Sequence, residues 1–220
     1  MFIHESLDWT DLDSVQEDGK RFYLTPSGKK YPSMTTVLQL MTAEGIAKWR
    51  ARVGDEVANK VSAQASRRGT LMHKLCEDYV NNEEVDTESL MPLDLQNFNA
   101  LKEQMDKHFG KVYGQEIALY SDFLEMAGRV DCIAEYKGKL SIIDYKTSKK
   151  VKKRSNIKNY FMQAAGYAVM FEEIFKKPIN NLVILMSVDH EGVVEFVEKR
   201  DDHIHDLIEL RKKYKEKNNI

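Results

Sequence analysis

The stretch "GRVDCIAEYKGKLSIIDYK", residues 128–146, predicts a β-hairpin with a two-residue turn at Lys137-Gly138. The apolar, β-branched residues before the second acid are typical of a buried strand. In this register Asp131 faces Asp144 on the same side of the hairpin, with Cβ atoms about 5 Å apart. A turn of three residues would put the two acids on opposite faces, so the prediction depends on the two-residue turn.

Two facing carboxylates repel each other, and burial also removes their hydration. A protein tolerates such a pair when a cation lies between the acids or when one acid is protonated. Oxygen ligands without matching cysteines indicate a hard cation, Mg²⁺ or Mn²⁺. Lys146 shares the face of Asp144 and is expected opposite Arg129, where it could orient a water or stabilise charge on a phosphate. The alternative is that both acids are ordinary strand-end residues paired with Lys146 or Arg129.

The remaining pattern predicts an α/β protein. Residues 22–38 predict a strand, a Pro/Gly turn and a helix capped by Ser33 or Thr35. Residues 44–82 predict a mostly helical segment in which Gly54 and Gly69 allow breaks. The further elements, in chain order, are a helix over 92–109, strands over 111–121 and within 125–148, a helix over 156–175, strands over 180–189 and 192–199, and a helix from about 201. This order indicates a mixed central β-sheet flanked by helices.

The domain prediction is a helical N-terminal region over 1–110, which forms one wall of a cleft, and a core over 111–220. Both parts are expected to belong to one structural domain, because the chain has 220 residues and no long linker.

Positive charge is concentrated in one segment. The chain has a net charge of −2, yet "KKVKKRSNIK" over 149–158 has six basic residues and no acid. Because the segment follows the strand that carries Lys146, it is expected to contact nucleic-acid phosphates, although such a run is often only a solvated loop. The predicted phosphate contacts are Lys149, Lys150, Lys152, Lys153 and Arg154, with Arg67 and Arg68 from the opposite wall.

Several classes of protein are disfavoured. Cys76 and Cys132 are far apart and form no CxxC pair, so no zinc knuckle or iron–sulfur cluster is expected. The glycine at Gly28 is not part of a P-loop, so no ATP-driven motor is expected. No apolar run is long enough to span a membrane, and the N-terminus has no apolar signal core. These features predict a cytoplasmic protein, in a bacterium or a phage-infected host cell, with no membrane partner.

The ordered motifs "RRGTLMHKLCEDY" (67–79), "QEIALYSDFLEMAGRVD" (115–131), "IIDYKTS" (142–148) and "QAAGY" (163–167) resemble the PD-(D/E)XK nuclease superfamily. The segments "FYLTPSGKKYPSMTTVL" (22–38) and "KWRARVGDEVA" (48–58) are similar to the opening of mitochondrial and phage members of its RecB-type exonuclease branch. The resemblance covers about residues 20–190. It implies a restriction-endonuclease-like core and no iron–sulfur cluster, because the cysteines that hold one in some relatives are missing here.

The resemblance also implies roles for individual residues. His73, Asp131 and Asp144 would bind one or two Mg²⁺ or Mn²⁺ ions, with help from the Tyr145 carbonyl. Lys146 would be the catalytic lysine. Glu116 would be an acid that supports the metal site. Gln163 and Tyr167 match the Q-x-x-x-Y helix of the family, which supports the site and contacts DNA.

Taken without the resemblance, some of these residues have ordinary explanations. His73 and Glu77 share a helix face and could be an exposed hydrogen-bonded pair. Gln163 and Tyr167 are also four apart and could serve helix packing alone. Both pairs therefore depend on the resemblance for a functional interpretation.

These observations favour a metal-dependent DNA exonuclease that acts on strand ends, with a preference for single-stranded DNA, in replication, repair or recombination. Two alternatives remain open at this point. One is a structure-specific endonuclease of the same fold. The other is a non-catalytic nucleic-acid-binding module, which would have no need for a cation between Asp131 and Asp144.

Overall fold

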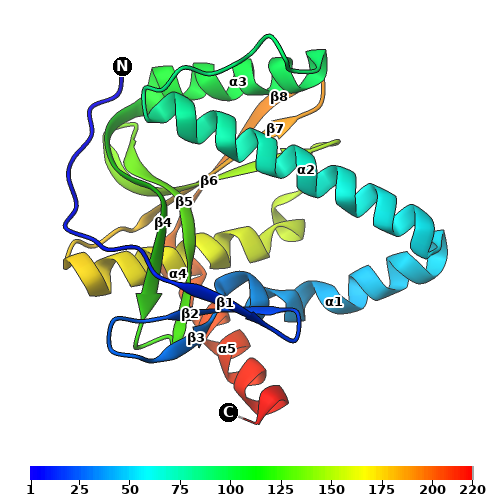
Figure 1. Cartoon of the computed structure of the whole chain (residues 1–220), viewed down its shortest axis with the longest axis vertical. Coiled ribbons are helices and arrows are strands. Elements are labelled where there is room, and N and C mark those ends of the chain that lie inside the picture. The colour runs from blue at the N-terminus through cyan, green and yellow to red at the C-terminus, as the bar shows by residue number, and fades with distance from the viewer. Residues whose placement is uncertain (220) are drawn as a thin grey trace.

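The computed structural model describes residues 1–219. Five strands form the central sheet in the order β4-β5-β6-β7-β8 (Figure 1). Their bounds are β4 Phe109–Ser121, β5 Met126–Tyr136, β6 Lys139–Ser148, β7 Asn181–Val188 and β8 Gly192–Lys199. Only β6 and β7 are parallel neighbours, which requires a crossover connection through a helix. The predicted fold class, a mixed central sheet flanked by helices, is confirmed.

Helices cover both faces of this sheet (Figure 1). The five α-helices are α1 Met34–Val53, α2 Asp55–Val80, α3 Pro92–His108, α4 Lys158–Phe175 and α5 Ile204–Asn218. Short 3₁₀ helices occupy Arg154–Asn156 and Arg200–Asp202. Helices α2 and α3 pack on one face of the sheet, and α1, α4 and α5 pack on the other. The predicted C-terminal helix thus begins three residues later than expected.

The interior strand β7 is apolar on both sides because both faces of the sheet are covered. In β7, Leu182, Ile184 and Met186 belong to the core beneath α1, α4 and α5. Their neighbours Val183 and Leu185 belong to the core beneath α2 and α3. The alternation of side chains along a strand therefore divides one apolar run between two cores.

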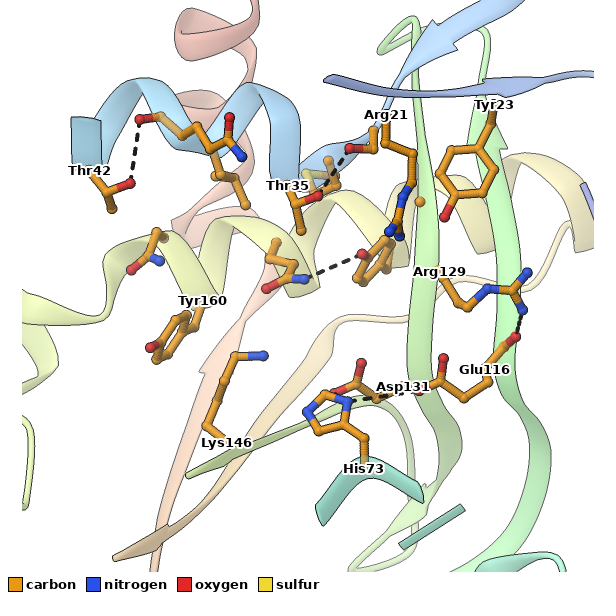
Figure 2. A pocket seen from close by; sticks show the side chains of 18 residues that line it. Arg21, Tyr23, Thr35, Thr42, His73, Glu116, Arg129, Asp131, Lys146 and Tyr160 are labelled. Carbon is orange, nitrogen blue, oxygen red and sulfur yellow. Dashed lines mark hydrogen bonds and ion pairs between the residues drawn. The ribbon is translucent and has the colours of Figure 1, made fainter. Parts of the chain in front are cut away.

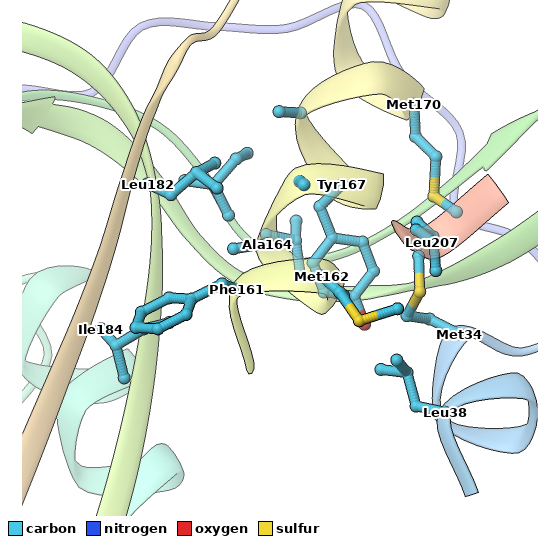
Figure 3. Packing of buried hydrophobic residues seen from close by; sticks show 14 of the residues in the cluster. Met34, Leu38, Phe161, Met162, Ala164, Tyr167, Met170, Leu182, Ile184 and Leu207 are labelled. Atoms are coloured by element: carbon cyan, nitrogen blue, oxygen red, sulfur yellow. The ribbon is translucent and has the colours of Figure 1, made fainter. Parts of the chain in front are cut away.

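Helix α1 is attached to the body by its N-terminal end. Met34 is fully buried in the core that contains Tyr167 and Leu207 (Figure 3). Gly166 of α4 allows this contact, since a Cβ there would lie 2.8 Å from Leu207 Cδ2 and would overlap Met34. The small residue lets α1 and α5 approach α4 closely.

The N-terminal region contains a second, three-stranded sheet, β1 Ser14–Glu17, β2 Lys20–Leu24 and β3 Lys30–Pro32. The prediction of a helical region over 1–110 is therefore wrong for its first third. These strands have only three to five residues, and the sequence predicted a strand only at β2, because so short a strand shows little hydrophobic pattern. The predicted cap at Ser33 is confirmed, because its side chain accepts a hydrogen bond from the Thr36 N–H at 3.1 Å.

Helices α1 and α2 meet at Gly54, which has a φ of +83° and breaks the helix as predicted. The helix does not break at Gly69, the second position where a break was allowed, because α2 continues from Asp55 to Val80. Nothing packs closely on Gly69, so the surrounding good helix formers determine the local structure. Residues 43–48 and 59–67 are exposed, and this projecting part of α1 and α2, residues 41–70, is called the α1–α2 arch below (Figure 1).

None of the helices within residues 1–219 combines the length and the apolar character needed to cross a membrane. The boundary at residue 110 stays a prediction. Residues from both sides of it, such as Met34 and Met170, share one core cluster.

We expect Met34→Ala to lower the free energy of unfolding by about 2–5 kcal/mol, because it opens a cavity in a fully buried core. Met41→Ala is the matched control, since Met41 lies on the same helix with 42% of its surface exposed. Urea denaturation should show a change below about 0.5 kcal/mol for the control. Equal effects of the two substitutions would contradict the anchoring role of Met34.

Candidate active site

The site lies where β5 and β6 separate. Their pairing runs from Tyr136 with Lys139 to Cys132 with Ile143, which confirms the predicted two-residue turn and register. Beyond Cys132, β5 continues beside β4 while β6 continues beside β7. The strands therefore diverge at Asp131 and Asp144, the two residues that the register places opposite each other.

The predicted pairing of Arg129 with Lys146 is wrong for the same reason. Arg129 lies opposite Ala118 of β4 instead. Its guanidinium donates to the Glu116 carbonyl and, at 2.6 Å, to Asp11 Oδ2. Arg129 thus connects β5 with β4 and with the N-terminal segment that carries Asp11. Lys146 instead pairs with Asp144.

Asp131 bridges the gap between the strands. Its Oδ2 accepts a hydrogen bond from the Tyr145 backbone N–H at 2.9 Å. This side chain replaces the strand partner that β6 loses at the fork. Asp131 is consequently fixed in position by the sheet itself.

Asp144 is almost completely buried, with 1% of its surface exposed. Burial raises its pKa to about 6, against the opposing effect of the Lys146 ammonium. Lys146 Nζ lies 2.5 Å from Asp144 Oδ2. Asp144 Oδ1 is buried and accepts no hydrogen bond from the residues described.

Lys146 connects this buried acid with the cavity. Its side chain is 19% exposed and lines the cavity, and its Nζ lies 5.1 Å from the centre of the Tyr160 ring. Burial would lower its pKa, but Asp144 and Asp131 outweigh burial and hold the pKa above its ordinary value. Lys146 is therefore a fixed cation at neutral pH.

His73 reaches the fork from α2. Its Nε2 lies 2.8 Å from the Tyr145 carbonyl oxygen, so this nitrogen must carry the hydrogen. Nδ1 then points toward Glu116 Oε1 at 3.8 Å and Asp131 Oδ2 at 3.6 Å. Burial would lower the pKa of His73, but the two carboxylates outweigh burial and raise it to about 9.

Glu116 completes the cluster from β4. Gln115 pairs with Cys132 and Ile117 pairs with Val130, so the register brings Glu116 opposite Asp131. Glu116 has a φ of +48°, an unusual value for a residue within a strand. The distorted backbone is compatible with a functional position.

His73, Glu116 and Asp131 offer three ligand atoms that all lie within 4.8 Å of one another (Figure 2). One imidazole nitrogen and two carboxylate oxygens suit a divalent ion such as Mn²⁺ or Mg²⁺. The unsatisfied Asp144 Oδ1 beside them supports the fit, since a buried acceptor is costly without a partner. The compact trio contains Glu116 and does not contain Asp144, so the predicted ligand role of Asp144 stays a prediction.

The predicted ligand role of the Tyr145 carbonyl also stays a prediction. This oxygen accepts the hydrogen of His73 Nε2. This hydrogen bond orients the His73 ring, and metal-binding histidines commonly donate their second ring N–H to such a carbonyl.

A cavity of about 440 Å³ opens beside the cluster, and a second of about 550 Å³ adjoins it and shares His73, Glu116 and Arg129. The first is also lined by α1 at Thr35, Gln39 and Thr42, and the second by α2 at Gly69 and Thr70. Both arms of the α1–α2 arch therefore form walls of the site.

Gln163 and Tyr167 line the first cavity from α4. Gln163 Nε2 donates to the Tyr167 hydroxyl at 3.4 Å, and burial raises the pKa of Tyr167. Tyr167 has only 2% of its surface exposed and packs within 3 Å of where a Cβ on Gly128 would lie. Tyr167 is thus part of the core as well as the cavity wall, and Gln163 offers the more accessible polar group.

The basic segment 149–158 contains exposed lysines as well as residues that are paired with other side chains. Lys149, Lys150 and Lys153 are exposed. Lys152 Nζ donates to the Tyr160 hydroxyl at 3.0 Å, and Arg154 forms an ion pair with Glu198. The three exposed lysines are therefore more available to contact phosphates than Lys152 and Arg154, and their contact with DNA stays a prediction.

Arg67 is exposed, but Arg68 is only 14% exposed and its charge is already paired. Arg68 contacts Asp189 at 2.5 Å and Asp94 at 3.5 Å. This geometry gives Arg68 a structural role and does not support its predicted contact with DNA. The sequence concealed this because Asp189 is 121 residues away.

Sequence reasoning missed several cavity residues. Thr35, Gln39 and Thr42 are spaced by three and four residues, so their shared helix face was a detectable signal. Arg21 of β2 also lines the cavity, and no motif marked it.

The chain belongs to the PD-(D/E)XK nuclease superfamily, whose profile matches residues 95–218. The match confirms the family resemblance. The matched segment includes Glu116, Asp131, Asp144 and Lys146, whereas His73 lies before it.

Among individual proteins, the chain is similar to "Mitochondrial genome maintenance exonuclease 1" of Homo sapiens, with 30% identity over 129 residues, and to that of Mus musculus, with 29% identity. Each alignment covers 55% of this chain and 38% of the relative, so the chain matches well under half the length of these relatives. The solved structure titled "Crystal structure of SSO0001" aligns over 80% of this chain and 72% of that chain, with a TM-score of 0.43 and 15% identity.

We expect the binding of Mn²⁺ to release about one proton near pH 7.5, because His73 is protonated below its pKa of about 9 and must lose that proton to coordinate. Affinity should rise about tenfold per pH unit between pH 6.5 and 8.5. Calorimetry in two buffers with different ionisation enthalpies measures the released proton.

His73→Gln should abolish the proton release, whereas His205→Gln, at an exposed position of α5, should keep it. Proton release that persists in His73→Gln would show that another group coordinates the ion.

Proposed function

We propose that this chain is a divalent-metal-dependent DNA exonuclease that acts at strand ends and prefers single-stranded DNA. The observation that carries the proposal is the cluster of His73, Glu116 and Asp131 next to the buried pair of Asp144 and Lys146. Members of this superfamily use divalent metals, and the matched relatives are named as exonucleases. A role in DNA replication, repair or recombination is part of the same proposal.

The reaction is hydrolysis of a phosphodiester bond. Water attacks phosphorus, the bond to the 3′ oxygen breaks, and the products are a 3′-hydroxyl and a 5′-phosphate. A bound divalent ion would stabilise the charge on the phosphate and activate the attacking water.

The residues of the chain hold and orient the reacting groups. Asp131 is fixed by the Tyr145 N–H and His73 by the Tyr145 carbonyl, so both keep a constant geometry toward the cavity. The Lys146 ammonium, held by Asp144, can donate hydrogen bonds to a phosphate oxygen or to the attacking water. Gln163 can donate to the strand from the opposite wall.

The α1–α2 arch supports the preference for strand ends. Its two arms line the two adjoining cavities, and residues 43–48 and 59–67 of these arms are exposed. A flexible single strand can enter between these arms more easily than a duplex of about 20 Å diameter, whose reactive phosphates lie on a rigid helix. The exposed lysines Lys149, Lys150 and Lys153 can hold the strand next to the cavity.

A comparison of circular and linear single-stranded DNA of the same sequence tests the requirement for an end. With Mn²⁺ or Mg²⁺, the linear form should be degraded to short products, the circle should resist, and EDTA should stop cleavage. A circle that is cut as fast as the linear form would favour the structure-specific endonuclease. The absence of any cleavage by folded protein would favour the non-catalytic binding module.

We expect Lys146→Met to reduce cleavage by at least about 10³-fold, because the site loses the cation that contacts the reacting phosphate. DNA binding should change less than about threefold, since the exposed lysines remain. Lys139→Met is the matched control, because Lys139 is an exposed lysine at the other end of the same strand. Cleavage by Lys146→Met at the control rate would remove Lys146 from the mechanism.

A further inference from the structure

Arg21 lines the active-site cavity, and within residues 1–219 its guanidinium has no hydrogen-bond or ion-pair partner. It reaches the cavity from β2, on the side away from His73 and Lys146 (Figure 2). No hydrogen bond or ion pair engages its side chain within residues 1–219. The other arginine of the cavity, Arg129, is already paired with Asp11. Arg21 therefore provides an uncompensated positive charge that faces the cavity.

The backbone of Arg21 is held firmly to the start of α1. Its N–H donates to Thr36 Oγ1 at 3.2 Å, and its carbonyl accepts from the Ser33 N–H at 2.8 Å and the Thr36 hydroxyl at 3.3 Å. Arg21 also pairs with Gln16 of β1. The Cα atom of Arg21 is thus fixed between a sheet and a helix, so the binding of a ligand has to order only the side chain of Arg21 and not its backbone.

The cavity is electrostatically divided. Glu116 and Asp131 lie at one end and suit a cation, whereas the end near Arg21 is lined by Thr35 and Gln39 and includes no carboxylate among the residues described. An anion that occupies the Arg21 end avoids repulsion by the acids and meets a fork-shaped donor that suits phosphate. A nucleic-acid strand carries such anions at regular spacing.

We propose that Arg21 forms a second phosphate-binding subsite, which holds a backbone phosphate of the single-stranded substrate next to the phosphate that is cleaved. This inference rests on the proposed function, because it assumes a nucleic-acid strand in the cavity. The subsite contributes to substrate binding and strand position, and Lys146 remains the cation at the reacting phosphate.

The strand β2 offers a matched control. Side chains alternate across a strand, so Lys20 points to the other face of the small sheet. There it donates to Asn218 Oδ1 at 2.7 Å and lines a separate cavity with Tyr214. Lys20→Gln and Arg21→Gln therefore remove the same charge from adjacent residues, one outside the active site and one inside it.

The test measures the binding of an oligothymidine of about 20 nucleotides in EDTA, by fluorescence anisotropy at several KCl concentrations. Arg21→Gln should reduce the slope of log affinity against log salt by about 0.7, the value for one lost phosphate contact on a single strand. Lys20→Gln should leave the slope unchanged, and Arg21→Lys should restore it. In cleavage assays with Mn²⁺, Arg21→Gln should raise KM about tenfold and change kcat less than about twofold.

Equal slopes for Arg21→Gln and the wild type would overturn the subsite, even if the wild type cleaves DNA. Wild-type protein that binds the oligonucleotide without cleaving it in Mn²⁺ would refute the proposed exonuclease, and the salt slopes would still decide the role of Arg21. Wild-type protein that neither binds nor cleaves would overturn both proposals. A loss of kcat with unchanged KM in Arg21→Gln would place Arg21 at the reacting phosphate and overturn its assignment to the neighbouring one.

Discussion

The backbone of Tyr145 positions Asp131 and His73, two of the three residues in the candidate metal-binding cluster. Its N–H donates to Asp131 Oδ2 at 2.9 Å, and its carbonyl oxygen lies 2.8 Å from His73 Nε2. The N–H and C=O of one residue in a strand point toward the same neighbouring strand. At this edge β5 has turned away, so Asp131 and His73 satisfy groups that would otherwise be buried without partners. The need to cap an open strand edge thereby positions the site.

The charges around this edge explain why the site suits a divalent ion. Glu116, Asp131 and Asp144 converge in a region of low exposure, and His73 and Lys146 are the cations among them. The Glu116 and Asp131 carboxylates raise the pKa of His73 to about 9, against the opposing effect of burial, and thereby favour the protonated imidazole. A dication that replaces this proton adds positive charge where the acids are least compensated. Burial raises the pKa of Asp144 to about 6, and its Oδ1 accepts no hydrogen bond within the described chain.

The hairpin was predictable in detail, because the turn at Lys137-Gly138 fixes every pair up to Cys132 with Ile143. The fork beyond these pairs was not predictable, since an alternating pattern does not reveal where two strands separate. The position of Glu116 required the β4–β5 register, which includes an irregularity between Val112 and Gly114. Arg68 was misjudged because its partner Asp189 is distant in sequence, and Arg21 was missed because the predicted strand begins at residue 22 and no motif includes Arg21.

Helix α1 links the parts of the molecule that would contact a substrate. Its first turn binds the backbone of Arg21, its buried face packs through Met34 on α4, and its polar face lines the cavity at Thr35 and Gln39. Its distal half is free of the core and forms one arm of the α1–α2 arch. A rigid helix held at one end transmits a change in packing at Met34 to both the cavity wall and the arch. The first turn of α1 therefore connects Arg21, through Thr36, with the core on α4, through Met34.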